Sequence, residues 1–208
     1  MGPPPSSFCG PGENLLDGER SVIQSDLVNA MEPAMLSVPV GVMSFFAVVW
    51  LTIGLAVAGQ VSLLPIGAGV ALSAALLWTA IRGDRAYTGP ALPPAQLKRM
   101  NQLVAWSSAT QGVAILIAVN VLINLGLPQY QICAVAVIVG LHFLPLARMP
   151  FTRGYYVTAA AMAGLGLLGC VLTESVRPLV VGPGCAVVLW LTCAWALRGR
   201  RRVVAAMA

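Results

Sequence analysis

The sequence predicts an all-α, polytopic membrane protein with six transmembrane helices arranged as three hairpins. Two observations support this prediction: the composition of the chain and the spacing of its charges. Of the 208 residues, 58% are hydrophobic and only 9% are charged, whereas a soluble domain carries about 25% charged residues. So few charges cannot cover a water-soluble surface of this size, so lipid is the expected solvent.

Charged residues divide the chain into three long apolar blocks. No Asp, Glu, Lys or Arg occurs in residues 33–81 or 100–147, and residues 154–197 contain only Glu174 and Arg177. A transmembrane helix needs about 20 residues. Each block is therefore too long for one span and accommodates two spans with a turn between them.

A turn signal lies near the middle of each block, and each is followed by a proline. The signals are Gly59-Gln60 before Pro65, Asn124-Leu-Gly126-Leu-Pro128, and Glu174-Ser-Val-Arg177-Pro178. Proline suits the first turn of a helix, where its missing N–H is not needed. The predicted helices are residues 36–58, 64–82, 102–125, 129–148, 154–173 and 179–198.

The distribution of lysine and arginine predicts the orientation. With the N-terminus inside the cell, every Lys and Arg except Arg177 falls in a cytoplasmic segment, as the positive-inside rule requires. We therefore expect a multi-pass protein of the cell (inner) membrane with both termini in the cytoplasm.

The expected domain organisation has three parts. Residues 1–34 form a cytoplasmic segment with a disordered start and a short acidic amphipathic helix at 13–32, residues 35–198 form the transmembrane domain, and residues 199–208 form a basic cytoplasmic tail. Topology and attraction to anionic lipid explain the basic tail, so nucleic acid is not an expected partner.

Small residues predict which helices pack closely, because lipid gives little hydrophobic drive for helix association. The second predicted helix carries Gly67, Ala71 and Ala75 at four-residue spacing, and the fifth is rich in alanine and glycine over residues 158–169. We expect these two helices to be buried in the bundle. The tryptophans are mostly assigned to aromatic belts at the membrane interfaces.

His142 is the one ionisable residue inside a predicted span away from its ends. It lies about 9 Å from the cytoplasmic end of its helix, given the rise of 1.5 Å per residue. Ser107, Ser108 and Gln111 of the preceding helix lie at a similar depth and could hydrogen-bond its imidazole. Pro145 cannot donate to the carbonyl of residue 141 and should kink the helix there. His142 is either a structural histidine or part of a ligand site.

Asn120 and Asn124 are four residues apart on the outer half of the third predicted helix. Such amides commonly hydrogen-bond between helices. The residues therefore either join helices or line a path for a ligand.

The five cysteines are Cys9, Cys133, Cys170, Cys185 and Cys193. Free cysteine behaves as a small buried hydrophobe, which fits the four that lie in apolar runs. A disulfide among Cys133, Cys170 and Cys185 stays open, because the topology places them at similar depth. No His or acid lies at ligand spacing beside them, so neither a metal site nor a cofactor is expected.

The stretch Gly140-Leu-His-Phe-Leu-Pro145-Leu-Ala147 is similar to a motif of an uncharacterised family of small bacterial six-span membrane proteins. The resemblance covers most of the membrane portion, and only this motif is specific. It implies the fold and a role for His142 and Pro145, but no activity.

Three functions remain open from the sequence. The first is binding or transport of a neutral or hydrophobic small molecule near His142, which a hydrated cavity there would favour. The second is a structural or partner-binding membrane subunit, which a dry, glycine-packed bundle would favour. The third is an intramembrane enzyme with His142 as a base, although no nucleophile or orienting acid is evident. A homo-oligomer is compatible with each.

The absence of intramembrane acids disfavours three further classes. Proton- and sodium-coupled transporters usually need a buried carboxylate. Zinc proteases need clustered His and acidic residues, and aspartyl intramembrane proteases need two aspartates. None of these sets lies within a predicted span.

Overall fold

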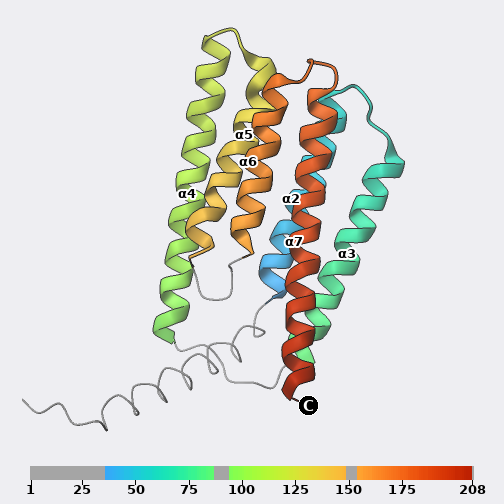
Figure 1. The fold of residues 1–208 in the computed structure, drawn as a ribbon, viewed down its shortest axis with the longest axis vertical. Coiled ribbons are helices and arrows are strands. Elements are labelled where there is room, and N and C mark those ends of the chain that lie inside the picture. The colour runs from blue at the N-terminus through green and yellow to red at the C-terminus, as the bar shows by residue number, and fades with distance from the viewer. Residues whose placement is uncertain (1–35, 87–93, 149–153, 208) are drawn as a thin grey trace, which may run out of the picture.

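The computed structural model describes residues 36–86, 94–148 and 154–207, and this part of the chain is all-α, as predicted (Figure 1). Its helices are α2 (Ser37–Val57), α3 (Leu63–Ala86), α4 (Pro94–Asn124), the 3-10 helix η1 (Pro128–Tyr130), α5 (Gln131–Leu146), α6 (Tyr155–Val171) and α7 (Arg177–Met207). The predicted disordered start and the helix at 13–32 lie outside the described residues.

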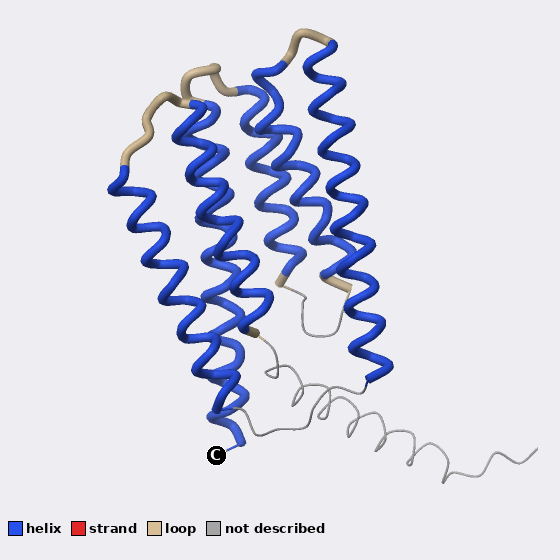
Figure 2. The backbone as a smooth tube through the Cα atoms, turned by 180° about the vertical axis from the view of Figure 1, so that it is seen from behind, coloured by secondary structure: helices blue, strands red, loops and turns tan. Residues whose placement is uncertain are grey.

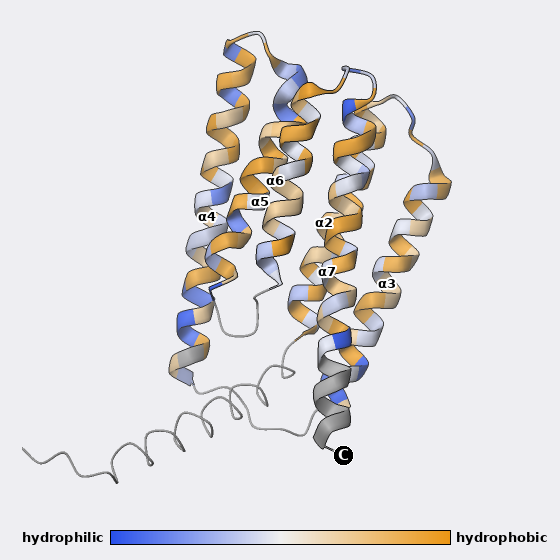
Figure 3. Ribbon diagram, in the orientation of Figure 1, coloured by the Kyte–Doolittle hydropathy of each residue, from blue (hydrophilic) through white to orange (hydrophobic). Residues whose placement is uncertain are grey.

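The six α-helices form three antiparallel hairpins, α2–α3, α4–α5 and α6–α7, with the third hairpin between the other two. Contacts run α4–α5–α6–α7–α2–α3, so that α3 and α4 lie at opposite edges of the bundle (Figures 1 and 2). The connections at 58–62, 125–130 and 172–176 share one end, which we call the turn end. The opposite end holds the start of α2 and the end of α7, and we call it the charged end because Arg82, Lys98 and Arg198 lie there (Figure 3).

Glycine forms two of the turns, at the positions where the sequence predicted them. Gly59 has φ of 66° and Gly126 has φ of 71°, a left-handed conformation that residues with a side chain rarely adopt. Each follows the end of a helix and is accompanied by a backbone bond that spans five residues, Gln60 N–H to the Leu55 carbonyl and Leu127 N–H to the Leu122 carbonyl. This arrangement satisfies carbonyls that a helix end otherwise leaves without partners.

Five helices of the described chain are long and apolar enough to cross a membrane, and α6 is an apolar helix of 17 residues. Two helices run further than the predicted spans at the charged end. α4 begins at Pro94 rather than near 102, and α7 continues to Met207 rather than ending near 198. The prediction used apolar residues to mark the spans, so it omitted polar turns that continue the same helices.

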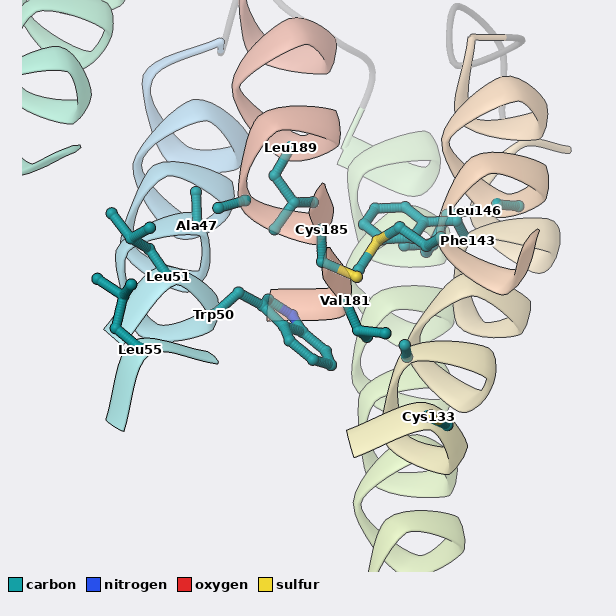
Figure 4. Close-up of a cluster of buried hydrophobic side chains, with 14 residues drawn as sticks. Ala47, Trp50, Leu51, Leu55, Cys133, Phe143, Leu146, Val181, Cys185 and Leu189 are labelled. Atoms are coloured by element: carbon teal, nitrogen blue, oxygen red, sulfur yellow. The ribbon is translucent and has the colours of Figure 1, made fainter. Parts of the chain in front are cut away.

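The core lies where α2, α5, α6 and α7 meet. Val181, Cys185 and Leu189 of α7 lie between Trp50 of α2 and Phe143 of α5 (Figure 4). All five side chains belong to one buried cluster that spans the four helices.

Backbones approach most closely at glycines of this core. A methyl carbon built on Gly182 would lie 2.5 Å from the Cα of Gly54, and one on Gly140 would lie 2.7 Å from the backbone nitrogen of Ala163. Such distances leave no room for any side chain larger than hydrogen. The glycines therefore set the spacing of α2 against α7 and of α5 against α6.

The expectation that the second predicted helix is buried is wrong. Only 11% of the apolar stretch of α3 is buried, compared with 39% for α2 and for α7. Gly67 has no atom within 4 Å of a built methyl carbon, and Ala71 and Ala75 are exposed. Small residues permit close packing but do not require it, and here the closest contact uses single glycines of α2 and α7. The fifth predicted helix, α6, is packed between α5 and α7 as expected.

Asp84 near the end of α3 caps the start of α2. Its carboxylate accepts hydrogen bonds from the backbone N–H groups of Leu36 (3.2 Å) and Ser37 (2.8 Å). A negative charge at a helix N-terminus satisfies free N–H groups and interacts favourably with the helix dipole. The first hairpin is thereby closed at the charged end by a contact between residues distant in sequence.

Replacing Gly182 by alanine should destabilise the bundle, because the added methyl group would overlap the backbone of α2 and force the two helices apart. Overpacking of this kind costs about 1–3 kcal/mol. Thermal unfolding in detergent should show a lower Tm than for the unmodified chain. Gly67→Ala on α3 is the matched control, since that position is open, and its Tm should not fall. Equal Tm values for the two variants would contradict the close approach of α2 and α7.

Candidate functional site

His142 of α5 and Ser107 of α4 are brought together by the second hairpin. The Oγ of Ser107 lies 2.9 Å from Nδ1 of His142 and 3.4 Å from the His142 carbonyl oxygen. Both residues are half-buried. The geometry agrees with the depth expected from the sequence, since both lie in the half of the bundle nearer the charged end.

The hydroxyl of Ser107 lies within hydrogen-bonding distance of two groups of His142. It donates its single hydrogen either to Nδ1 or to the carbonyl oxygen, and in the second case it accepts from an Nδ1–H group. Pro145, one turn further along α5, lies inside the helix and cannot donate a hydrogen bond. The serine therefore adds a hydrogen bond to a segment of α5 whose ladder the proline interrupts.

The imidazole has a second ring nitrogen available for a polar ligand. Within the described part of the chain, Nε2 of His142 has no hydrogen-bond partner, and no carboxylate orients it. The imidazole and the ring of Phe143 form a T-shaped pair (5.7 Å between centroids), and Phe143 forms another with Tyr155 of α6 at 5.5 Å. Through Nε2 of His142, the pair of Ser107 and His142 can bind a hydroxyl or carbonyl group of a neutral molecule.

The other predicted site residues do not join His142. Gln111 is half-buried and Ser108 is exposed, and neither hydrogen-bonds the imidazole. Asn120 and Asn124 are both exposed, and Asn120 donates through Nδ2 to the carbonyl of Leu116 in its own helix (2.8 Å). A ligand-binding role for the six predicted residues, His142, Ser107, Ser108, Gln111, Asn120 and Asn124, stays a prediction.

His142 lines neither of the following two hollows of the described chain. An open hollow of about 460 Å³ lies over Pro94, Leu97, Lys98, Asn101, Gln102 and Ala105 at the charged end of α4. A smaller one, of about 20 Å³, lies among α2, α6 and α7 beside Tyr155 and Thr192. A volume of that size holds about one water molecule.

Inside the core, hydroxyl groups join helices in a way that the sequence did not reveal. Ser73 of α3 accepts a hydrogen bond from Nε1 of Trp190 in α7 (2.9 Å) and donates to the carbonyl of Ser44 in α2 (3.1 Å). Thr158 of α6 and Thr192 of α7 are hydrogen-bonded at 2.7 Å and are both buried. The contact between Ser73 and Trp190 joins two different hairpins, so no spacing rule within one hairpin could have paired these two residues.

Arg177 is the one basic residue at the turn end among the residues that the structure describes, and it is buried and joins three segments of the chain. Its guanidinium donates to the carbonyls of Gly169 (2.9 Å), Gln129 (3.0 Å) and Leu172 (3.0 Å) and lies over the ring of Tyr130 at 4.3 Å. The first and third carbonyls belong to the end of α6 and the second to the turn before α5. Arg177 therefore satisfies free helix-end carbonyls. The sequence marked it only as an exception to the charge rule.

Cys133, Cys170, Cys185 and Cys193 are free thiols, so no disulfide joins the three cysteines for which it was left open. Cys9 lies outside the described residues. Among the residues that the structure describes, no group of three or more His, Cys, Asp or Glu side chains could hold a metal ion.

Residues 93–199 match a family described as "Family of unknown function (DUF7010)". The chain belongs to the DUF7010 family. The match covers α4 to α7 and so includes His142, Ser107 and Arg177. Membership confirms the expected place in an uncharacterised family. No curated protein and no solved structure matches the chain.

In this DUF7010 protein, replacing Arg177 by lysine should lower stability. One ammonium group cannot reach three carbonyls in three directions as the guanidinium does, and a hydrogen bond to a charged group contributes about 1.5–3 kcal/mol. The free energy of unfolding should fall by about 2 kcal/mol, measured by denaturant titration in detergent. Glu174→Gln, in the same turn but exposed, is the control and should leave it unchanged. An Arg177→Lys chain as stable as this control would show that the three bonds do not support the turn end.

Proposed function

We propose that this protein is a six-span subunit of the bacterial inner membrane, with both termini in the cytoplasm, whose helix α4 binds a partner helix within the bilayer. The orientation is supported by the positions of the basic residues. Arg82, Lys98, Arg148 and Arg198 lie at the charged end, whereas Arg177 lies at the turn end and is bound by carbonyls. Basic residues that face the cytoplasm follow the positive-inside rule.

The observation that carries the proposed partner binding is the exposure of α4. No residue in its apolar stretch is buried, compared with 28% for α5, its partner in the hairpin. Only one side of α4 is half-buried, and that side packs on α5. The rest of the helix faces outward over its whole length (Figures 1 and 2).

Exposure alone would fit lipid, but the exposed surface of α4 is polar where that of α3 is not. Ser108, Asn120 and Asn124 are exposed on α4. On α3 the exposed polar side chain of the middle region is Thr79, whose hydroxyl bonds carbonyls of its own helix. Amides that face hydrocarbon are unfavourable unless another helix provides partners. The edge helix α4 thus has the surface of a contact helix, and α3 has the surface of a lipid-facing one.

The packing of the core supports a partner-binding subunit over a transport path through the bundle. Gly54 and Gly182 bring α2 and α7 into backbone contact, and Gly140 and Gly166 do the same for α5 and α6. The hydroxyl groups of Ser73, Thr158 and Thr192 in the core bond one another or backbone carbonyls. A dry bundle of this kind is what the second sequence-based hypothesis requires.

A photo-reactive amino acid placed at Leu116 of α4 should crosslink to a protein in intact cells, because that side chain is exposed on the proposed contact surface (65%). The same amino acid at Leu72 of α3, which is also exposed (44%), is the matched control and should crosslink only to lipid. The readout is a discrete protein adduct on a denaturing gel. Protein adducts of equal yield at both positions, or none at Leu116, would overturn the proposal.

A second candidate function is the binding of a neutral small molecule, and the pairing of Ser107 with His142 favours it. The half-buried imidazole lies in the seam between α4 and α5, and α4 is an edge helix of the bundle. A molecule dissolved in the bilayer could therefore approach it sideways.

Native mass spectrometry of the protein purified from its own membrane tests this second candidate. A bound molecule should appear as a mass adduct that His142→Ala and Ser107→Ala both remove. Ser108→Ala is the control, since Ser108 is exposed and not bonded to His142, and it should keep the adduct. An adduct that is indifferent to all three changes would exclude His142 as its site, and an unmodified mass for the parent chain would remove the candidate.

A further inference from the structure

We infer that Cys133 and Cys170 form a redox-active pair of thiols that exchanges with external disulfides at the turn end of the bundle. In this pair Cys170 reacts first with the external disulfide, and Cys133 then closes a disulfide within the chain. The inference goes beyond the proposed binding of a partner helix and does not depend on it.

The two cysteines lie on helices that are in direct backbone contact. Cys133 is in the first turn of α5 and Cys170 is in the last turn of α6, so both lie at the turn end. A methyl carbon built on Gly166, one turn before Cys170, would lie 2.7 Å from the carbonyl oxygen of Cys133. A disulfide needs Cα atoms about 4.4–6.8 Å apart, and two helices as close as these can meet that requirement.

The two thiols lie against the same turn of α6. The Sγ of Cys133 would lie 2.7 Å from a methyl carbon built on Gly169, the residue directly before Cys170. The Cys170 thiol donates to the carbonyl of Gly166 at 3.5 Å, and the Cys133 thiol interacts with the Cys170 side chain as a hydrogen-bonding neighbour. The two sulfur atoms are therefore neighbours across the seam between α5 and α6, and both are free thiols in this structure.

The two thiols differ in their access to solvent. Cys133 is only 1% exposed, whereas Cys170 is exposed. Glu174, four residues after Cys170, is also exposed and marks the polar end of the span. Cys185 and Cys193 are buried, so among the described cysteines Cys170 is the one that an external molecule can reach.

A positive charge lies beside the pair. The Nε of Arg177 donates to the carbonyl of Gly169 at 2.9 Å. The methyl carbon built on Gly169, which would meet the Cys133 sulfur, would lie 3.7 Å from Cγ of Arg177. Reactive cysteines react as thiolates and are typically found next to Lys, Arg or His. Arg177 therefore places a cation next to the residue that precedes Cys170.

The reaction is a thiol–disulfide exchange in two steps. The Cys170 thiolate attacks one sulfur of the external disulfide, which forms a mixed disulfide and releases the first thiol. The Cys133 sulfur then attacks the Cys170 sulfur, which releases the second thiol and leaves a Cys133–Cys170 disulfide. The pair loses two electrons and two protons, and the external disulfide gains them and becomes two thiols.

The compartment follows from the orientation proposed above. The turn end then faces away from the cytoplasm, on the side of the membrane where disulfides form and persist. The external disulfide is accordingly one that is present outside the cytoplasm, on a small molecule or on a protein.

Equilibration of the purified protein with glutathione and its disulfide at a series of ratios tests the pair. Free thiols are then alkylated and the sites identified by mass spectrometry. The parent chain should form a Cys133–Cys170 disulfide as the share of oxidised glutathione rises. Cys133→Ala should instead carry glutathione on Cys170, because no second thiol displaces it, and Cys170→Ala should leave Cys133 reduced. Cys185→Ala, which also removes a fully buried thiol, is the matched control and should form the disulfide as the parent does.

Tm values of the three variants check that each is folded. The inference is overturned if Cys133 and Cys170 of the parent chain stay reduced at every ratio. It is also overturned if Cys170 pairs with Cys185 instead, or if glutathione accumulates on Cys170 equally in the parent and in Cys133→Ala.

The source of the external disulfide can be trapped in intact cells, because Cys133→Ala cannot release a molecule bound to Cys170. A discrete protein adduct on a non-reducing gel identifies a protein disulfide, and a small mass increase on Cys170 identifies a small-molecule disulfide. If the purified protein forms the disulfide but Cys170 carries no adduct in cells, the pair stands and the proposed orientation falls.

Discussion

The close approach of helix backbones at a few glycines is the constraint on which the rest of this structure depends. In lipid there is little hydrophobic gain from bringing helices together, so the bundle relies on van der Waals contact and hydrogen bonds. Gly54 against Gly182, and Gly140 against Ala159 and Ala163, bring the backbones of α2 with α7 and of α5 with α6 into direct contact. Helix α6 of the second pair packs against α7 of the first. The two pairs therefore form one unit of four helices, and α3 and α4 lie at its edges.

This packing decides where polar groups can act. Inside the four-helix unit, the hydroxyl groups of Thr158 and Thr192 bond each other. At the turn end, Arg177 is held by carbonyls. Among the described residues, His142 and Asn120 keep unused bonding capacity, one in the seam between α4 and α5 and one on α4. The same close packing that stabilises the bundle thus places its available chemistry on one edge, where another helix or a molecule in the bilayer can reach it.

Much of this fold could be predicted from the sequence, because the spacing of charged residues and the hydropathy identify each helix by itself. The six apolar segments, the turns at Gly59 and Gly126 and the pairing of neighbours in hairpins were all predictable. The position of Ser107 beside His142 was also accessible, since a short turn fixes the relative depth of the two helices.

The order of the hairpins was not predictable from the same rules. A run of small residues in α3 resembled an interface, yet α3 faces outward, and the decisive glycines are isolated ones in α2 and α7. Contacts between distant segments, such as Asp84 with the start of α2 or Ser73 with Trp190, depend on which hairpin lies next to which. A single sequence contains no pattern that shows which hairpins lie next to each other.

The central claim is that the bundle is dry and that function lies on its edge. The thiol of Cys185 measures this directly, because the residue is fully buried at the centre of the core, where α7 meets α2 and α5. Folded protein in lipid vesicles, with Cys9 and Cys170 replaced by serine, would be treated with a small water-soluble thiol reagent, and the modified sites identified by mass spectrometry. The account predicts no modification of Cys185 until the protein is unfolded. Rapid modification of Cys185 in the folded protein would show a hydrated path through the bundle and contradict it.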